Sequence, residues 1–280
     1  MNISLKADLH CHSYFSDGVL TPEALLQKAL EAKIDLLALT DHDTIEGVDR
    51  LREAASQHAI RIIDGVELSV RWKMHDIHVL GLNLDRTHPT LLALLLKQNT
   101  QRTERAKLIA ERLEEIGVQS IFQKACDLAG HERIGRPHLA QVLINEGVVK
   151  DMSTAFKKYL GRGKSAYVPT TWLSIEEAVT GIIKSGGWAV IAHPLKYKLT
   201  RSKLHALIGD FKQAGGQGIE VVSGEINKTQ IDEMAGLCIR FDLLASTGSD
   251  YHNDSYSRIK LGQQSLLPPN CQPIWEKWSM

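Results

Sequence analysis

Two histidines close the first apolar run of the chain, in the sequence Asp8-Leu9-His10-Cys11-His12. Because side chains alternate between the faces of a strand, His10 and His12 are expected on one face and Cys11 on the other. Paired imidazoles suit borderline divalent metals such as Zn²⁺, Mn²⁺ and Fe²⁺, with carboxylates completing the coordination shell. An isolated pair could equally be two solvated side chains at a strand end, so the rest of the chain decides between the two interpretations.

Similar groups of histidines and acids follow later apolar runs. They are TDHD (40–43), GVE (65–67), His78 in IHVLGL, AHP (192–194) and GSDYH (248–252). In parallel α/β barrels the carboxyl ends of the strands form the face that carries catalysis. Motifs at several strand ends would meet there, which favours a shared metal site over scattered surface residues.

The elements that must position these motifs are short strands alternating with helices. The β-rich runs are ISLKADL, DLLALT, IRIIDGV, IHVLGLNL, WAVIAH, GIEVVS and LLASTGS. Amphipathic segments of helical length separate most of them, and Thr21-Pro22-Glu23 supplies a cap, a first-turn proline and an acidic first turn for the first helix. The pattern predicts an α/β fold, a seven-stranded barrel with parallel strands.

The alternation stops between residues 99 and 166, where helical patterns such as RTERAKLIAERLEEIG and HLAQVLINEG follow one another. We interpret this segment as an inserted helical subdomain that divides the barrel into residues 1–98 and 167–280. Its last part, FKKYLGRGKSAYVP, places basic residues around glycines: Lys157, Lys158, Arg162 and Lys164. They could hold a phosphate backbone without reading bases, or they could be ordinary solvated charges that close a helix.

Composition limits the class of partner. Apolar residues make up 43% of the 280 residues, and 33 basic side chains balance 33 acidic ones. A neutral chain does not attract polyanions over long range, so a nucleic acid must be bound by a local patch, and no DNA duplex is expected. The start of the chain shows neither a secretory signal nor a membrane span, and the four cysteines form no C-x-x-C pair. We therefore expect a cytoplasmic protein with reduced thiols and no membrane partner.

Taken in order, the motifs closely resemble those of the PHP (polymerase and histidinol phosphatase) family over nearly the whole chain. They are DLHCH, Asp17 in YFSDG, TDHD, GVE, the histidine of IHVLGL, GRPH (135–138), AHP and GSDYH. The resemblance implies a distorted seven-stranded (β/α) PHP barrel that binds up to three divalent metals. Mn²⁺ is the first expectation, and Fe²⁺ or Zn²⁺ also suit mixed nitrogen and oxygen ligands.

The resemblance also implies which residues hold each metal. The sets are His10, His12, Glu67 and Asp250 for the first, Glu67, His78 and His138 for the second, and Asp17, His42 and His252 for the third. Glu67 would bridge the first two. A hydroxide between two metals would then attack phosphorus, while the metals neutralise the phosphate oxygens.

Other residues of the motifs have supporting roles in this interpretation. Arg136 and His193 are expected as catalytic or substrate-binding groups, since a guanidinium can hold a phosphate and a histidine can donate to an oxygen. Asp8 and Asp43 are expected to orient metal-bound imidazoles. Trp72 is expected to pack at a strand end in preference to stacking on a base. The histidines outside the motifs are expected on the surface or at helix caps: His58, His75, His88, His131 and His205.

The insert and its flanks resemble one subgroup of the family, that of nucleoside 3′,5′-bisphosphate phosphatases and RNase AM. The shared segments are LTPEALLQKALEAK, GLNLDRTHP, RAKLIAERLE, FKKYLGRGK and YVP. This resemblance implies hydrolysis of the 3′-phosphate of nucleoside 3′,5′-bisphosphates, 5′→3′ exoribonuclease action on short 5′-phosphorylated RNA, or both. The basic loop would then contact the 5′-phosphate or the following backbone.

Two alternatives stay open. A small-molecule phosphatase of the histidinol phosphate type would share the metal cluster but should need no helical insert or basic loop. A noncatalytic PHP module would usually lack ligands, whereas every expected position is filled here. The segment SGEINKTQ (223–230) matches no motif, so base preference is not predicted, and neither is the oligomeric state.

Overall fold

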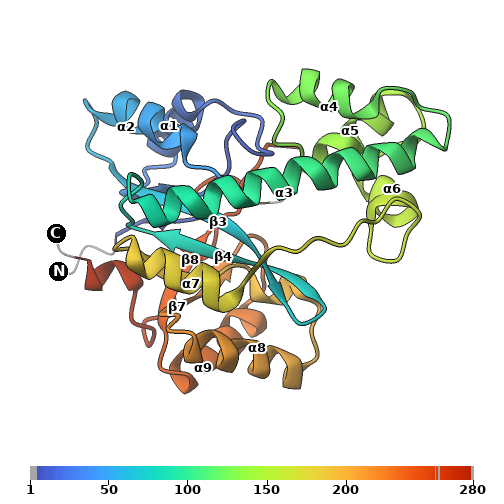
Figure 1. Cartoon of the computed structure of the whole chain (residues 1–280). Helices are drawn as coiled ribbons and strands as arrows, with labels where there is room; N and C mark the ends of the chain where they lie inside the picture. The colour runs from blue at the N-terminus through green and yellow to red at the C-terminus, as the bar shows by residue number, and fades with distance from the viewer. Residues whose placement is uncertain (1–4, 256, 258, 279–280) are drawn as a thin grey trace.

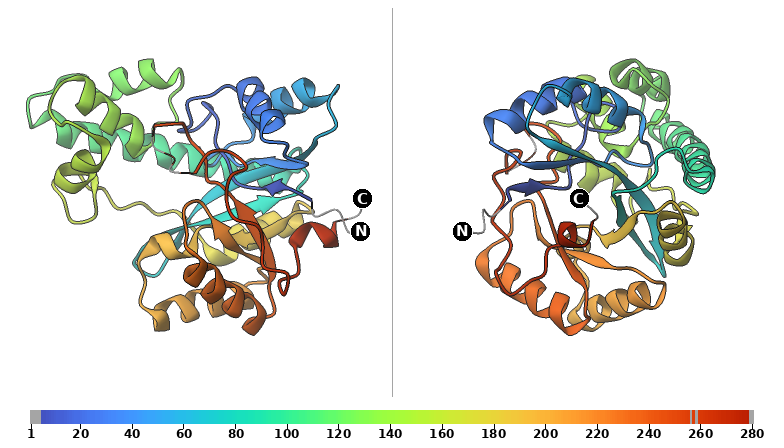
Figure 2. Two further views of the ribbon diagram at one scale, coloured as in Figure 1. Left: turned by 180° about the vertical axis from the view of Figure 1, so that it is seen from behind. Right: turned by 90° about the vertical axis from the view of Figure 1, so that its left-hand side faces the viewer.

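The structure, a computed structural model, describes residues 5–255, 257 and 259–278. Seven strands form a nearly closed barrel, and helices cover its outside (Figures 1 and 2). The strands around the barrel are β1 (Ala7–Asp8), β2 (Leu36–Leu39), β3 (Arg61–Trp72), β4 (His75–Leu82), β6 (Trp188–Ile191), β7 (Gly218–Ser223) and β8 (Leu244–Gly248). The short β5 (Leu173–Ser174) pairs with the outer part of β3. The predicted α/β barrel of seven strands is confirmed.

One strand differs from the prediction of a parallel sheet. β4 runs antiparallel to both β3 and β6. Trp72 pairs with His75, so only Lys73 and Met74 join β3 to β4, and a connection this short can only make an antiparallel hairpin. Lys73 accordingly has a positive φ of 51°. The reversal places the start of β4, with His78, at the end of the barrel where the other strands finish.

The barrel closes between β1 and β8. Leu9 N–H donates to Thr247 O at 3.0 Å, and His12 N–H donates to Tyr251 O at 2.9 Å just beyond the two strands. Gly248 permits this approach, because a Cβ there would lie 2.2 Å from His10 Cβ. The barrel interior is apolar and packs against Ile274, the first residue of the short helix η3 (Ile274–Lys277), and Trp278, which follows it.

Five helices of the described residues, besides the first part of α3 (Pro89–Glu114), pack against the outside of the barrel. They are α1 (Pro22–Glu31), α2 (Glu46–Ala55), α7 (Ile175–Lys184), α8 (Arg201–Gln213) and α9 (Lys228–Arg240). Thr21 caps α1 as predicted, since its side chain accepts the N–H of Ala24. Asn227 and Gln230 form a capping box that starts α9. This box accounts for part of the segment 223–230, to which the sequence assigns no motif.

The helical insert has a hydrophobic core of its own, built from residues between Ala106 and Val168. Its helices are α3 (Pro89–Glu114), α4 (Ile121–Ala129), α5 (Arg136–Asn145), α6 (Met152–Ala155) and the π-helical turn η1 (Phe156–Leu160). α3 is one continuous helix that begins on the barrel and ends in the insert (Figure 1), so the expected boundary at residue 99 falls inside it.

Polar contacts join the insert to the barrel. Gln98, fully buried in the middle of α3, donates to Asp43 Oδ1 and to Ser69 O at 2.9 and 2.6 Å. On the other side, Arg133 donates to both carboxylate oxygens of Glu46 at 2.7 and 2.8 Å. The insert is thus fixed to the barrel from two directions.

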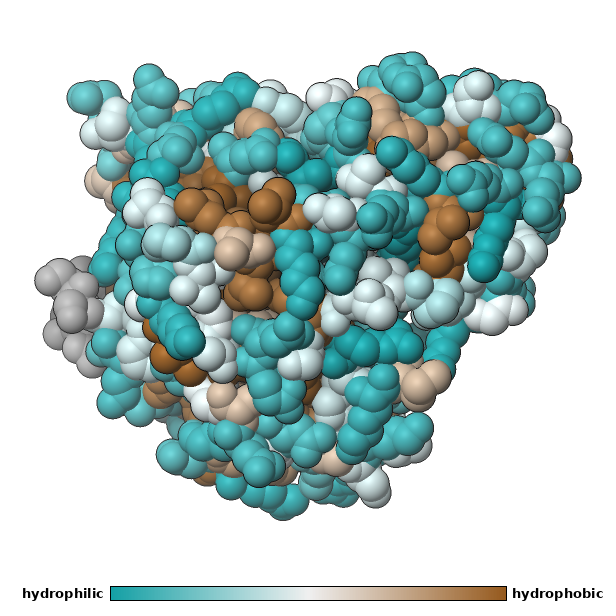
Figure 3. Space-filling model, viewed as in Figure 1, coloured by the Kyte–Doolittle hydropathy of each residue, from teal (hydrophilic) through white to brown (hydrophobic). Residues whose placement is uncertain are grey.

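The surface seen in Figure 3 is mainly hydrophilic, with apolar side chains gathered over the amino-terminal half of α3. Leu92 and Leu96 belong to this region and are exposed. Among the helices of the described residues, none is long and apolar enough to span a membrane.

We predict that Gly248→Ala destabilises the protein by about 1–3 kcal/mol, because the added methyl group forces β8 away from His10. The matched control is Gly236→Ala in α9, where an added Cβ meets nothing within 4 Å and should gain up to about 1 kcal/mol of helix propensity. Denaturant unfolding of both variants checks this. Equal stabilities for the two would contradict the account of barrel closure.

Candidate metal centre

A first set of donors comes from β3 and from the segments that follow β1 and β8. His10 Nε2 and His12 Nε2 lie 3.3 and 3.2 Å from Glu67 Oε2. The same two nitrogens lie 3.4 and 3.3 Å from Asp250 Oδ1. All four side chains are buried. The structure thus brings together the four residues expected around a first metal.

A second set surrounds the other oxygen of Glu67. His78 Nδ1 and His193 Nε2 lie 2.9 and 3.0 Å from Glu67 Oε1 and 3.2 Å from each other. His193 follows β6 with a φ of 27°, a strained value for a residue other than glycine. Its N–H donates to Glu220 Oε2 at 2.5 Å, which holds this conformation.

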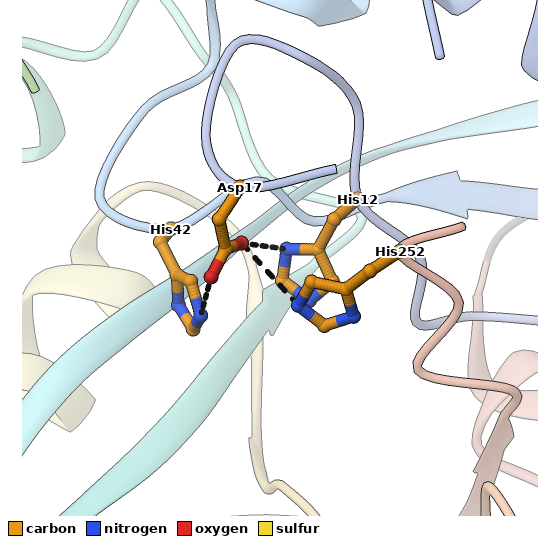
Figure 4. Close-up of side chains that lie close together, drawn as sticks. All are labelled: His12, Asp17, His42 and His252. Carbon is orange, nitrogen blue, oxygen red and sulfur yellow. Dashed lines mark ion pairs between the residues drawn. The ribbon is translucent and has the colours of Figure 1, made fainter. Parts of the chain in front are cut away.

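A third set lies around Asp17, in the loop after β1 (Figure 4). His252 Nε2 lies 3.3 Å from Asp17 Oδ1, and His42 Nε2 lies 3.8 Å from Oδ2. His12 Nδ1 also approaches Asp17, at 3.8 Å, and His42 Nδ1 lies 3.0 Å from Glu67 Oε2. The three sets share residues and form one continuous cluster.

The unpaired atoms of the cluster fit divalent metals. His10 Nε2, His12 Nε2, His42 Nδ1 and Glu67 Oε2 are buried without a hydrogen-bond partner among the described residues. Buried polar atoms are normally satisfied, so four unsatisfied ones at one point require an explanation. A mixed set of imidazole and carboxylate donors is the type that holds Zn²⁺, Mn²⁺ or Fe²⁺.

The electrostatics of the cluster also favour cations. Burial alone would lower the pKa of His10, but the charges of Glu220, Glu67 and Asp250 outweigh it and raise this pKa well above its usual range. For His12, burial is likewise outweighed by the neighbouring carboxylates of Asp250 and Glu67, which raise its pKa to about 10. The carboxylates therefore create a field that protons or metal ions must neutralise.

His138 does not join Glu67 and His78, which corrects the expected second set. His138 Nδ1 accepts the N–H of Gly135 at 3.1 Å, and the ring also hydrogen-bonds the backbone of Ser16. These contacts occupy the ring, and burial lowers its pKa to about 4. Among the described residues, two other imidazoles lie near His78 at Glu67: that of His193, which the sequence analysis assigned to substrate, and that of His42, whose Nδ1 lies 3.0 Å from Glu67 Oε2.

Asp8 and Asp43 have partners other than imidazole rings. Asp8 accepts the N–H of Ser249 at 2.9 Å and so holds the segment after β8 against β1. Asp43 accepts from Gln98 at 2.9 Å and pairs with Arg102, and it has a φ of 53°. This corrects the expectation that the two carboxylates orient metal-bound histidines.

The carboxylate that lies behind the His10 ring is that of Glu220, which the sequence analysis missed. Glu220 is 1% exposed, and its Oε1 lies 2.9 Å from His10 Nδ1, on the ring edge opposite the cluster. A carboxylate behind an imidazole fixes the tautomer and raises the basicity of the ligand. The only sequence signal was an acid inside the apolar run GIEVVS, where a strand otherwise buries its side chains.

A cleft of about 610 Å³ opens beside the cluster, between the barrel and the insert. Asp17, Asp250 and His252 lie on its cluster side. Its other walls are largely apolar and include Val19, Leu128, Ala129, Met152 and Ile259. The volume is in the range typical of sites that bind small organic ligands.

Lys196, a second residue that the sequence analysis missed, also lines the cleft. Its ammonium pairs with Asp250, and about half of its side chain is exposed. A cation is thus available where the cleft meets the donor cluster.

The predicted basic contacts lie outside this cleft. Arg136 begins α5, and its guanidinium carbon stands 5.6 Å from the centre of the Phe156 ring. The side chains of the basic loop are exposed, and none of them lines the cleft: Lys157, Lys158, Arg162 and Lys164.

The histidines outside the motifs belong to none of the donor sets found among the described residues. His88 caps α3 as predicted, accepting the N–H of Thr90 at 3.2 Å, and His131 lies 3.0 Å from Tyr14 O. Trp72 is 4% exposed and donates to Asp210, so the prediction that it packs at a strand end is confirmed.

Comparisons with known proteins agree with this architecture. The PHP domain family model matches residues 8–160. The chain is 43% identical over 273 residues to a 5′-3′ exoribonuclease of Haemophilus influenzae, covering 98% of this chain and 99% of that relative. It is also 43% identical over 273 residues to a 3′,5′-nucleoside bisphosphate phosphatase of Chromobacterium violaceum, covering 96% and 95% of the two chains.

A solved structure shares the fold over almost its whole length. It is an amidohydrolase from Chromobacterium violaceum with bound SO₄ and no metal. It superposes with a TM-score of 0.92 at 42% identity, covering 97% of this chain and 95% of that one. The resemblance drawn from the motifs is confirmed, and the chain belongs to the PHP domain family.

Proposed function

We propose that the protein is a metal-dependent phosphoesterase that acts on nucleotides. Its substrates would be nucleoside 3′,5′-bisphosphates, which lose the 3′-phosphate, and short 5′-phosphorylated RNA, which is degraded from the 5′ end. The observation that carries this proposal is the donor cluster opening directly into a cleft with an apolar far wall. A phosphate would lie against the cluster while the base packs on the wall. The two similar relatives are named for these two activities.

The donor sets would hold two or three divalent ions, with Mn²⁺ as our first choice. Bound ions would supply Lewis acidity toward a phosphate oxygen and lower the pKa of a water molecule. Glu67 would contribute to the first and second sets, and His193 would take the place beside His78 that the sequence analysis gave to His138. Glu220 would hold the ring of His10 in position.

Residues around the cluster would bind and orient the substrate. The Lys196 ammonium faces the cleft beside Asp250 and could neutralise a phosphate oxygen there. Leu128 and Met152 of the insert would cover one face of the base. The exposed loop residues would contact RNA beyond the first nucleotide: Lys157, Lys158, Arg162 and Lys164.

We also infer a cytoplasmic location, because the four cysteines are unpaired, as in proteins kept in a reducing compartment.

The direct test compares hydrolysis of adenosine 3′,5′-bisphosphate, a short 5′-phosphorylated RNA and histidinol phosphate by Mn²⁺-loaded protein. We expect the first two to be cleaved and the third to be at least about a hundredfold slower, since it cannot fill the apolar cleft. Release of phosphate and nucleotide is measured. Turnover of histidinol phosphate alone would reject the nucleotide assignment, and no turnover at all would favour a noncatalytic module.

Two substitutions separate a ligand from the residue that orients one. Glu67→Gln should abolish turnover and lower the number of bound metals, because Glu67 belongs to both the first and second sets. Glu220→Gln should weaken metal binding by about 10–100-fold while activity returns at high metal concentration. The control is Glu233→Gln on the exposed surface of α9. Metal affinity is measured by calorimetric titration. If Glu220→Gln binds metal as tightly as the wild type, Glu220 does not orient the His10 ligand.

The apolar wall predicts a change in KM. Leu128 is 50% exposed, so Leu128→Ser should leave the fold intact but remove the surface that a base would cover. We expect KM for adenosine 3′,5′-bisphosphate to rise about five- to tenfold with little change in kcat. Leu96→Ser, at an exposed leucine that does not line the cleft, is the control and should behave as wild type. Equal KM values would show that the base binds elsewhere.

A further inference from the structure

Four arginines gather where α3, α5 and the β3–β4 hairpin meet. Arg102 and Arg105 lie on one face of α3, with their guanidinium carbons 5.2 and 5.3 Å from the centre of the Trp172 ring. The other two are Arg71, at the end of β3, and Arg136, at the start of α5. This group, called the arginine cluster below, is separate from the metal ligands.

Arg105 is the most deeply placed of the four. It is 9% exposed, and its Nε donates to Val168 O at 3.2 Å. Its Nη2 is buried and has no hydrogen-bond partner among the described residues, and Asp76 Oδ2 approaches it only to 3.9 Å. A buried guanidinium nitrogen without a partner is costly, which points to a ligand that completes it.

Arg136 lies close enough to Arg105 for their like charges to interact. Burial and this repulsion lower the pKa of Arg105 to about 9. In the described part of the chain, no hydrogen bond or ion pair to the Arg136 guanidinium is found, and its contact is the face of Phe156. The carboxylates that pair with the cluster are Asp43, bound to Arg102, and Asp76, bound to Arg71 at 2.5 Å. Four positive charges thus meet two negative ones.

The arginine cluster begins beside the metal centre and outside the cleft. Arg102 lines a small hollow together with Asp17 and His42 of the third donor set. Neither Arg102, Arg105 nor Arg136 lines the large cleft. A strand with its first nucleotide in the cleft and its scissile phosphate at the metals would therefore continue toward the arginines.

We propose that Arg105 and Arg136 bind a phosphate of single-stranded RNA, one downstream of the phosphodiester that the metal centre hydrolyses. This rests on the proposed function. Guanidinium groups match phosphate oxygens in a bidentate fork, and a phosphate would supply both the missing hydrogen-bond acceptor and the missing negative charge. Further basic residues lie beyond the cluster, near His75 on the hairpin. Burial lowers the pKa of His75, and the charges of Lys203, Arg162 and Arg71 lower it further.

The test uses the full chain with Arg136→Gln and Arg105→Gln, and Arg240→Gln as a control at an exposed arginine of α9. Binding of a 5′-phosphorylated tetraribonucleotide is measured by fluorescence anisotropy in chelator, where no cleavage occurs, at several salt concentrations. We expect about tenfold weaker RNA binding in both cluster variants. The logarithm of the binding constant should also fall less steeply with the logarithm of the salt concentration, with a slope smaller in magnitude by about 0.7 for each phosphate that the variant no longer neutralises. The control should match wild type.

A second arm measures KM with Mn²⁺-loaded protein. The rise in KM should be about tenfold larger for the tetraribonucleotide than for adenosine 3′,5′-bisphosphate, which has no downstream phosphate. Equal rises would place the arginines at the 5′-phosphate and overturn the proposal, as would wild-type affinity and salt slope in both variants. A lowered Tm with an unchanged salt slope would mean a purely structural role. Failure of the proposed function would look different from failure of this proposal. In that case the wild-type protein would cleave neither substrate, whatever the binding measurements show.

Discussion

The structure depends on keeping one carboxylate, Glu67, charged at a place that water does not reach. Glu67 is 0% exposed, and burial by itself would favour its protonated form. The neighbouring imidazoles of His10, His78 and His42 outweigh burial and hold its pKa well below the usual value. Those histidines come from different strands, so the charge of Glu67 is maintained only when the barrel is closed. The surroundings that keep Glu67 charged therefore depend on side chains that the closed barrel brings together.

The hydrogen-bond network around the cluster follows from the same constraint. Each ring must present a particular nitrogen to Glu67, and this requires the backbone to be fixed nearby. His193 and Asp250 both adopt positive φ values, and each is held by a bond to a neighbouring segment, to Glu220 Oε2 and to His10 O respectively. Local strain at these two residues is offset by contacts that the rest of the barrel supplies.

Much of this could be predicted from the sequence, since motif spacing reports what each strand end carries. The seven strands are of this kind, whereas the set of His10, His12, Glu67 and Asp250 was expected from the resemblance to the PHP family. The direction of β4 could not be obtained from periodicity, because a hydrophobic run reads the same in either direction. The separation of His138 from Glu67 could not be predicted either, because it accompanies backbone contacts of the ring with Gly135 and Ser16 that the sequence does not reveal. Glu220 was hidden because a buried acid in a strand has no local pattern of its own.

The continuity of α3 has a consequence for how this fold can be divided. The helix has Leu91 and Leu95 in the core of the barrel and Ile109 and Leu113 in the core of the insert, with Gln98 fastened to β3 between them. The connection on the amino-terminal side of the insert is therefore a helical turn, whereas the chain returns to the barrel through the non-helical segment between η1 and β5. An exchange of inserts between related proteins would have to join the chains inside α3, in helical register, because a difference of one residue there would rotate the entire insert by about 100° around the helix axis.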